Sequence, residues 1–243
     1  MLIIPAIDMR NGKCVRLFKG DFARETVFSD HPEEMAMKWQ SAGARFLHLV
    51  DLDGALAKKP MNLAAVERIL GSVDIPVELG GGIRSLENIE EVLALGVSRV
   101  ILGSVAVQNP ALVKEACQKY EERIIVGIDA KDGIVAVDGW GVSGEVEAGE
   151  LAKRMVNAGV RTIIYTDISR DGTLSGVNAE ATIALAKESG AAVIASGGVN
   201  SLDDIRRLKA LEADGVCGVI VGKSIYTGAL DLQEAIEIAG QEG

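Results

Sequence analysis

The sequence predicts a single closed (β/α)8 barrel, an α/β fold built from two duplicated half-barrels. Eight short β-branched apolar runs alternate with helical patterns along the 243 residues. These runs are continuously apolar, as expected for parallel strands that are buried on both faces. The two halves of the chain also repeat each other. An open doubly wound sheet is the competing fold, but it would not require this four-plus-four duplication.

The internal repeat matches segments of the first half with segments of the second. IIPAID at 3–8 returns as IIVGID at 124–129, and LHLVDLDGAL at 47–56 returns as IIYTDISRDGTL at 163–174. GGGIRSL at 80–86 returns as SGGVNSL at 196–202. The offsets of 121, 116 and 116 residues are far longer than the period of a solenoid or propeller repeat. We therefore predict half-barrel repeats of approximately 1–122 and 123–243 within one domain.

The strands and helices follow from the apolar runs and their flanking residues. Strands are expected near 2–7, 45–50, 75–79, 98–102, 123–128, 161–166, 191–195 and 216–221. Helical patterns lie at 32–43, 85–96, 110–120, 147–159 and 201–211. Ser85 and Ser201 are suited to N-capping two of these helices.

Two connections are long and occupy equivalent places in the repeat. They span residues 9–31 and 130–146, and they open on the turn signals Asn11-Gly12 and Asp132-Gly133. Each signal could start a small hairpin. Long βα loops at the C-terminal face of a barrel are usually functional, so we expect two lids there.

Composition excludes several classes of function. The net charge of −10 argues against nucleic-acid binding, which needs a basic surface. Cys14, Cys117 and Cys217 have no metal-binding spacing and are expected to be reduced thiols. With only two histidines, no catalytic metal is expected. No apolar run reaches membrane-spanning length and the N-terminus has no signal-peptide pattern, so we expect a cytoplasmic protein that does not bind membranes.

Two aspartates at equivalent places in the repeat are the main catalytic candidates. Asp8 and Asp129 each follow an apolar run and should lie at the C-terminal end of a strand, where barrel active sites are found. The first and fifth strands of an eight-stranded barrel are opposite each other. The two carboxylates should therefore face each other across the mouth, an arrangement suited to one acid and one base. Alternatively, each Asp could simply cap the turn that follows it.

Glycine-rich turns in both halves predict two phosphate sites. GGGIRS at 80–85 and SGGVNS at 196–201 each connect a strand to a helix, and LGS at 102–104 and VGKS at 221–224 end two further strands. Glycine lets backbone N–H groups approach an oxyanion, and the N-terminus of a helix favours negative charge. Tight turn geometry alone could also explain the glycines. The candidate phosphate-binding residues are Gly81, Gly82, Arg84, Gly103, Ser104, Gly176, Gly197, Gly198, Gly222 and Lys223.

Further residues could contact a substrate between the two phosphate sites. Arg16, in the first long loop, could supply positive charge, and His48 could point either into the mouth or into the core. Trp140 could stack on a flat heterocycle. At least one polar residue at the ends of the second and sixth strands is expected to contact substrate hydroxyls; this group comprises Asp51, Asp53, Thr166, Asp167 and Asp171.

Together these motifs resemble the ProFAR isomerase family of histidine biosynthesis, which isomerises phosphoribosylformimino-aminoimidazole-carboxamide ribotide. The resemblance spans essentially the whole chain, and its most specific segments are IIPAIDMRNGKCVRLFKGD, LHLVDLDGA, ELGGGIR, TDISRDGTLSG and ASGGV. It implies a (β/α)8 barrel that acts on a small-molecule bisphosphate without a cofactor. By position it implies Asp8 as general base and Asp129 as general acid. It also implies Asp171 as a further functional carboxylate that rivals Asp129, and Thr166 as a substrate-binding residue.

The resemblance implies an Amadori rearrangement, which converts an aminoaldose into an aminoketose. We expect the protein to be a monomer. Three alternatives remain. The cyclase subunit of imidazole-glycerol-phosphate synthase shares the repeat, but the opening segment of that family has a pattern similar to VVKGVNF where this chain has VRLFKGD. A bifunctional variant that also isomerises phosphoribosylanthranilate would carry an Arg near the Trp of the second long loop, where this chain has Val137, Asp138 and Gly139. A non-catalytic phosphometabolite-binding barrel is disfavoured by the paired aspartates.

Overall fold

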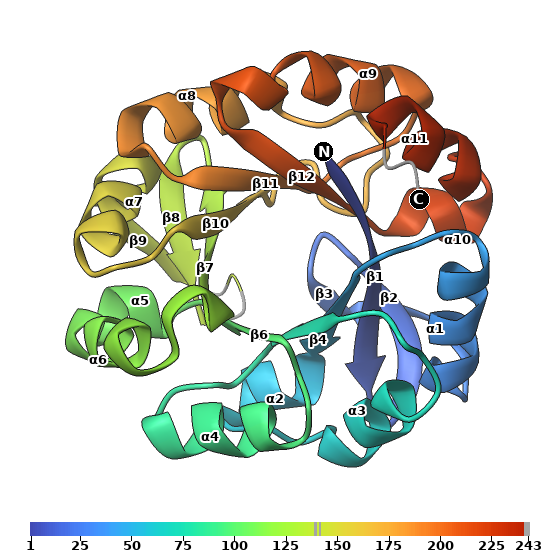
Figure 1. The fold of residues 1–243 in the computed structure, drawn as a ribbon, viewed down its shortest axis with the longest axis horizontal. Coiled ribbons are helices and arrows are strands. Elements are labelled where there is room, and N and C mark those ends of the chain that lie inside the picture. The colour runs from blue at the N-terminus through green and yellow to red at the C-terminus, as the bar shows by residue number, and fades with distance from the viewer. Residues whose placement is uncertain (139, 141, 241–243) are drawn as a thin grey trace.

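Eight parallel strands close into a barrel, as the sequence predicts (Figure 1). The computed structural model describes residues 1–138, 140 and 142–240. Around the barrel the parallel strands run in the order β1, β4, β5, β6, β7, β10, β11 and β12, and β12 pairs with β1. The parallel strands are β1 (Leu2–Arg10), β4 (Leu47–Asp51), β5 (Val77–Gly80), β6 (Arg99–Leu102), β7 (Ile124–Lys131), β10 (Thr162–Asp167), β11 (Ala192–Ser196) and β12 (Val216–Val221).

Helices form the outer layer of the barrel (Figure 1). They are α1 (Pro32–Ser41), α2 (Leu52–Ala57), α3 (Leu63–Leu70), α4 (Leu86–Ala94), α5 (Val105–Gln108), α6 (Pro110–Tyr120), α7 (Ala148–Asn157), α8 (Ala179–Ser189), α9 (Leu202–Ala210), α10 (Lys223–Thr227) and α11 (Leu232–Ala239), with 3-10 turns η1 (Glu121–Arg123) and η2 (Glu212–Asp214). The predicted caps are confirmed. Ser85 accepts a hydrogen bond from the N–H of Asn88, and Ser201 forms a capping box with Asp204. Within the described residues, no helix is both long and apolar enough to span a membrane.

Two hydrophobic clusters hold the strands in place. The larger lies between the sheet and the helices. The smaller fills the barrel interior and consists of Ile4, Ala6, Ile101, Ile125, Ile164, Ile194 and Ile220. Complete burial of one such aliphatic side chain contributes about 1.5–3 kcal/mol to folding. The barrel interior is therefore a packed core rather than a channel.

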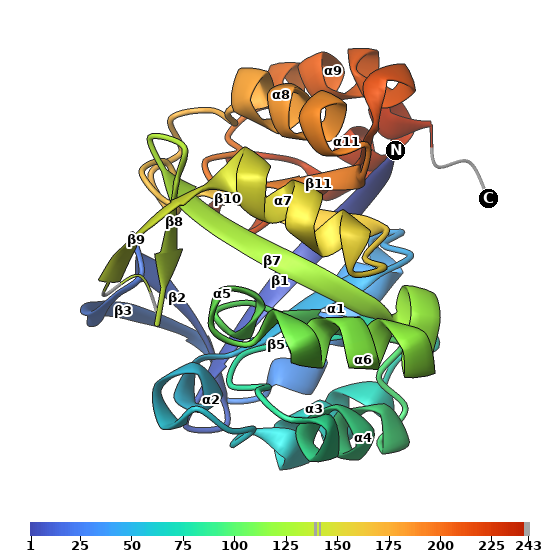
Figure 2. The same cartoon turned by 90° about the vertical axis from the view of Figure 1, so that its left-hand side faces the viewer.

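The two long connections are hairpins that extend the barrel strands. β1 continues to Arg10 and pairs with β2 (Lys13–Phe18), which pairs with β3 (Asp21–Ser29). β7 likewise pairs with β8 (Ile134–Val137), followed by β9 (Val142–Glu147). Both predicted turn dipeptides have positive φ at both residues, 50° and 74° at Asn11-Gly12 and 52° and 79° at Asp132-Gly133. Figure 2 shows both hairpins projecting from the same end of the barrel.

These hairpins correct one detail of the expected strand ends. Asp8 and Asp129 each lie two residues before the end of their strand, because antiparallel pairing with the hairpin continues the backbone ladder past them. β1 and β7 are opposite each other in the strand order, so the two aspartates still belong to opposite walls at the mouth.

Candidate active site

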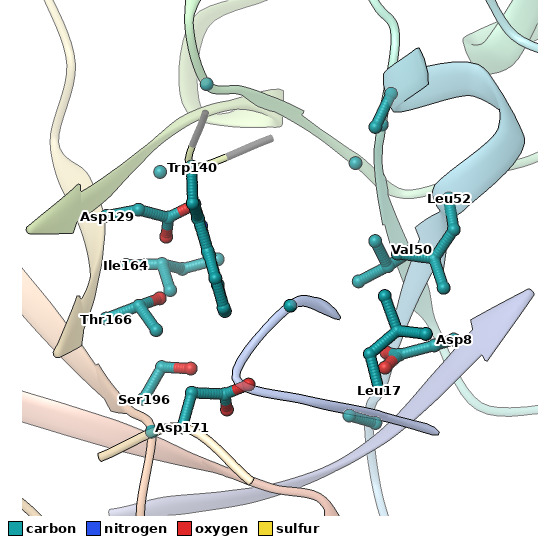
Figure 3. Close-up of a pocket in the computed structure, with 18 of the residues that line it drawn as sticks. Asp8, Leu17, Val50, Leu52, Asp129, Trp140, Ile164, Thr166, Asp171 and Ser196 are labelled. Atoms are coloured by element: carbon teal, nitrogen blue, oxygen red, sulfur yellow. The ribbon is translucent and has the colours of Figure 1, made fainter. Parts of the chain in front are cut away.

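One cavity of about 270 Å³ lies at the mouth of the barrel and contains almost all of the candidate residues. Figure 3 shows Asp129, Thr166 and Asp171 on one side of it and Asp8 on the other. Of the seventeen candidates, the sixteen that line the cavity are Asp8, Arg16, His48, Gly81, Gly82, Arg84, Gly103, Ser104, Asp129, Trp140, Thr166, Asp171, Gly197, Gly198, Gly222 and Lys223. Gly176 lies outside the lining, because its N–H donates to the carbonyl of Gly198 and its backbone packs against Asp204.

Asp8 is paired with a buried cation. Oδ1 of Asp8 lies 2.9 Å from Nη1 of Arg16, and both side chains are largely buried. Arg16 belongs to β2, the strand next to Asp8 in the hairpin, so local pairing places the two groups together. An ion pair requires an ionised carboxylate, the form in which Asp8 could accept a proton. The guanidinium of Arg16 also lies over the ring of Tyr226, at 5.8 Å from its centroid.

Asp129 is held by two hydrogen-bond donors on its own wall of the cavity. The indole Nε1 of Trp140 donates to Oδ2 of Asp129 at 2.7 Å, and Thr166 supplies a second side-chain hydrogen bond. Burial raises the pKa of Asp129, while these hydrogen bonds lower it; the balance is a raised pKa. This shift favours the protonated acid, the form that can donate a proton.

Asp171 lies in the turn after β10, close to both other carboxylates. Its pKa is raised to about 6, chiefly by burial; the charge of Arg16 lowers it, and the carboxylates of Asp8 and Asp129 add to the rise. A carboxyl group with a pKa near neutrality can exchange protons efficiently under physiological conditions. The site therefore combines one carboxylate in an ion pair with two carboxyl groups that are biased toward the protonated form.

The glycine-rich turns lie on two sides of the cavity. Gly103 and Ser104 precede α5, and Gly222 and Lys223 stand at the start of α10. Nothing lies within 4 Å of the Cβ position at Gly103, so the backbone there is open to a ligand. At Gly222 the corresponding space is taken by the guanidinium of Arg16. Any side chain at residue 222 would displace Arg16 from its position beside Asp8.

Arg84 is held at the rim of the cavity by an acidic residue of the second hairpin. Its Nη2 donates to Oδ1 of Asp138 at 2.7 Å, and Gln108 also donates to Asp138. The backbone N–H of Asp138 donates to Oγ of Ser104 at 2.9 Å. The second hairpin is thus attached to the first of the two glycine-rich sites. Gly139, which precedes Trp140 in the second long connection, lies outside the described residues.

The two hairpins meet over the cavity. The ring of Trp140 lies against Gly20, where an added Cβ would be 2.5 Å from Cζ3 of the indole. An added Cβ at Gly172, next to Asp171, would lie 3.0 Å from the carbonyl oxygen of Leu17 in the first hairpin. Nζ of Lys223 donates to the carbonyl of Gly172 at 2.9 Å. The segments that carry Arg16, Trp140 and Asp171 therefore support one another.

Not all of the acidic residues at the strand ends belong to the site. Asp51 N-caps α2 and accepts hydrogen bonds from the backbone N–H groups of Gly54 and Asn62. Asp167 accepts from Ser169 and from Asn178. Both residues therefore have structural roles, and in this group only Thr166 and Asp171 line the cavity. Across the described ranges, no cluster of three His, Cys, Asp or Glu residues could hold a metal ion.

Comparison with known proteins identifies the family. Residues 2–231 match the model of a family described as "Histidine biosynthesis protein". The chain belongs to this family. A relative from Trichlorobacter lovleyi is 58% identical over 98% of this chain and 97% of its own length. Relatives from Pelobacter propionicus and Geobacter sulfurreducens are 55% and 53% identical over essentially their whole lengths. All three are named 1-(5-phosphoribosyl)-5-((5-phosphoribosylamino)methylideneamino) imidazole-4-carboxamide isomerase.

Sequence reasoning missed two charged residues of this member of the family. The sequence indicates Asp138 only as a neighbour of Trp140, whereas in the structure it binds Arg84. Glu78 belongs to the ELGGGIR segment, and the sequence predicts no role for it, yet its side chain is completely buried and contacts His48. A carboxylate within a buried apolar strand was the available signal, because an ionised group is rarely buried without a partner.

Proposed function

We propose that the protein is the isomerase that its relatives' name describes, converting the bisphosphorylated aminoaldose ProFAR into the aminoketose PRFAR in histidine biosynthesis. The observation that carries the proposal is the placement of Asp8 opposite Asp129 and Asp171 across one cavity, with a glycine-rich phosphate site in each half of the barrel. A substrate with a phosphate at each end would span such a cavity and leave its ribose between the carboxyl groups.

The acid in this mechanism opens the ribose ring. A carboxyl group donates a proton to the ring oxygen, the C1–O bond breaks, and the nitrogen lone pair forms a protonated Schiff base at C1. We assign this role to Asp129, because its raised pKa favours the protonated form and its hydrogen bond with Trp140 fixes the carboxyl group on one wall of the cavity. Asp171 is the rival, because its pKa of about 6 also suits a proton donor.

The base acts on the opened sugar. Asp8, ionised in its pair with Arg16, removes the proton from C2 and gives an enolamine. Loss of the proton from the C2 hydroxyl and protonation at C1 then complete the aminoketose. Each step is a proton transfer that positioned carboxyl groups can perform. Arg16, His48, Trp140 and Thr166 are proposed to position the substrate.

The phosphate groups are proposed to bind at the two glycine-rich sites. The first consists of Gly81, Gly82, Arg84, Gly103 and Ser104, and the second of Gly197, Gly198, Gly222 and Lys223. Gly176 acts there only indirectly, through its bond to Gly198. Phosphate arriving at the first site would compete with Asp138 for Arg84, which links substrate binding to the position of the second hairpin. We further propose that the protein is a cytoplasmic monomer.

Assays of the purified protein on three reaction mixtures test this function: ProFAR alone, ProFAR with ammonia, and phosphoribosylanthranilate. We expect turnover of ProFAR without ammonia, and little turnover of phosphoribosylanthranilate, which carries one phosphate and would fill one site. Product formation only with ammonia would indicate the cyclase reaction. Comparable kcat/KM on ProFAR and phosphoribosylanthranilate would establish the bifunctional alternative, with Arg16 serving the carboxylate of the smaller substrate. No turnover of any of the three would refute the proposal.

A further inference from the structure

A row of three ionisable side chains runs along the inner wall of the barrel from the cavity toward the packed interior. His48 and Glu78 are register partners on β4 and β5, and Glu78 and Arg99 are register partners on β5 and β6. Nδ1 of His48 lies 2.8 Å from Oε1 of Glu78, and Nη2 of Arg99 lies 2.5 Å from Oε2. The side chain of Glu78 has no exposed surface. Both oxygens of a buried carboxylate are therefore bound, one by each neighbouring strand.

The two ends of this row are fixed by different surroundings. Arg99 lies over the ring of Phe46 at 4.1 Å from its centroid, and Phe46 packs against the isoleucine cluster inside the barrel. His48 lies on β4 and lines the same cavity as Asp129. The row thus connects the packed interior to the reacting end of the barrel.

We propose that Glu78 is a positioning residue that fixes His48, with Arg99 as its counter-ion. An ionised carboxylate only accepts hydrogen bonds, so the hydrogen between the two side chains must be on Nδ1 of His48. In a neutral imidazole, Nε2 is then the acceptor, on the ring edge away from Glu78. Nε2 is thereby prepared to accept a hydrogen bond from a substrate hydroxyl in the cavity. The role in turnover rests on the proposed isomerase function.

Nitrogen-15 NMR of histidine tests the geometry without substrate. The chain has only two histidines, and the second, His31, is exposed and serves as an internal reference. A His31→Asn variant assigns the two signals. We expect Nδ1 of His48 to carry a hydrogen and Nε2 to carry none in the wild-type protein; hydrogens on both nitrogens would overturn the proposal. An Nδ1 without hydrogen would overturn the proposal, whatever any variant does.

Glu78→Gln tests the consequence with nearly unchanged shape. Its amide has one acceptor and one donor end, and Arg99 can bind only the acceptor. The amide N–H2 is then directed at Nδ1 and should move the hydrogen of His48 to Nε2, with the His31 signals unchanged. On the isomerase substrate we expect kcat to fall about 10- to 100-fold, as for comparable supporting residues, and KM to change less than about threefold.

A double-mutant cycle separates positioning from general stability. If Glu78 acts through His48, Glu78→Gln in a His48→Asn background should change kcat by less than about twofold. An undiminished loss in that background, or wild-type kcat in Glu78→Gln with the altered tautomer, would overturn the proposal. Failure of the wild-type protein to isomerise ProFAR would refute the proposed function instead, and the NMR result would still decide the geometry.

Discussion

Gly20→Ala should weaken catalysis by moving Trp140 away from Asp129. An added Cβ at residue 20 would lie 2.5 Å from Cζ3 of the indole, whereas carbon atoms pack at about 3.5–4.0 Å. The ring must therefore retreat by about 1 Å or more. Nε1 of Trp140 now donates to Asp129 at 2.7 Å, and the same displacement would take it beyond hydrogen-bonding distance.

The expected loss follows from that one hydrogen bond. A bond of this kind is worth about 1.5 kcal/mol, between the values for neutral and charged partners. Lost in the transition state, it corresponds to about a tenfold fall in kcat/KM. Steady-state kinetics on ProFAR measures this change. Thermal unfolding of the same variant measures the separate cost of an alanine at φ 69°, about 1–2 kcal/mol.

Gly12→Ala is the matched control. Residue 12 also has a left-handed φ, 74°, but nothing lies within 4 Å of its Cβ position. Its variant should lose similar stability while keeping kcat/KM within about twofold of the wild type. Wild-type kcat/KM in Gly20→Ala, or an equal loss in Gly12→Ala, would refute the claim that contact with Gly20 holds Trp140 in place.

Two further predictions concern the carboxyl groups. Asp171→Asn should stabilise the protein at pH 8 and much less at pH 4. The folded-state pKa of about 6 lies above the ordinary 3.8, so the native state loses up to about 3 kcal/mol of stability as pH rises through this range and the buried carboxyl group ionises. Denaturant unfolding of the wild type and the variant at both pH values measures the difference in stability. Equal differences at pH 4 and pH 8 would contradict burial of an ionised Asp171 as the cause. Asp8→Asn should reduce kcat by about 10²–10⁴-fold or more while calorimetry still detects substrate binding, and substantial remaining activity would make Asp8 a turn residue.

The sequence predicted the barrel because its signals are local and repeated. Each of the eight expected strands overlaps an observed one, and the dipeptides at 11–12 and 132–133 form the turns that their residue types favour. Side chains that follow a strand could also be assigned to the mouth, since parallel strands place their C-terminal ends together. This is why sixteen of the seventeen candidates were found to line one cavity.

Other parts of the site depend on contacts between distant segments, which leave little trace in the sequence. The pair of Arg84 and Asp138 joins residues 54 positions apart. The contact of Trp140 with Gly20 depends on how two hairpins lean toward each other. Asp51 ends β4 and Asp171 lies shortly after β10, but Asp51 caps a helix and Asp171 lines the cavity. Their local sequences do not distinguish these outcomes.

The most direct test of the proposed function is a crystal structure of Asp8→Asn with ProFAR bound. We expect one phosphate beside Gly82 and Gly103 and the other beside Gly198 and Gly222. The ribose that is to be opened should lie between residue 8 and Asp129. A ligand with only one phosphate held at these turns, or with either phosphate bound at the N-terminal end of the barrel, would contradict the proposal.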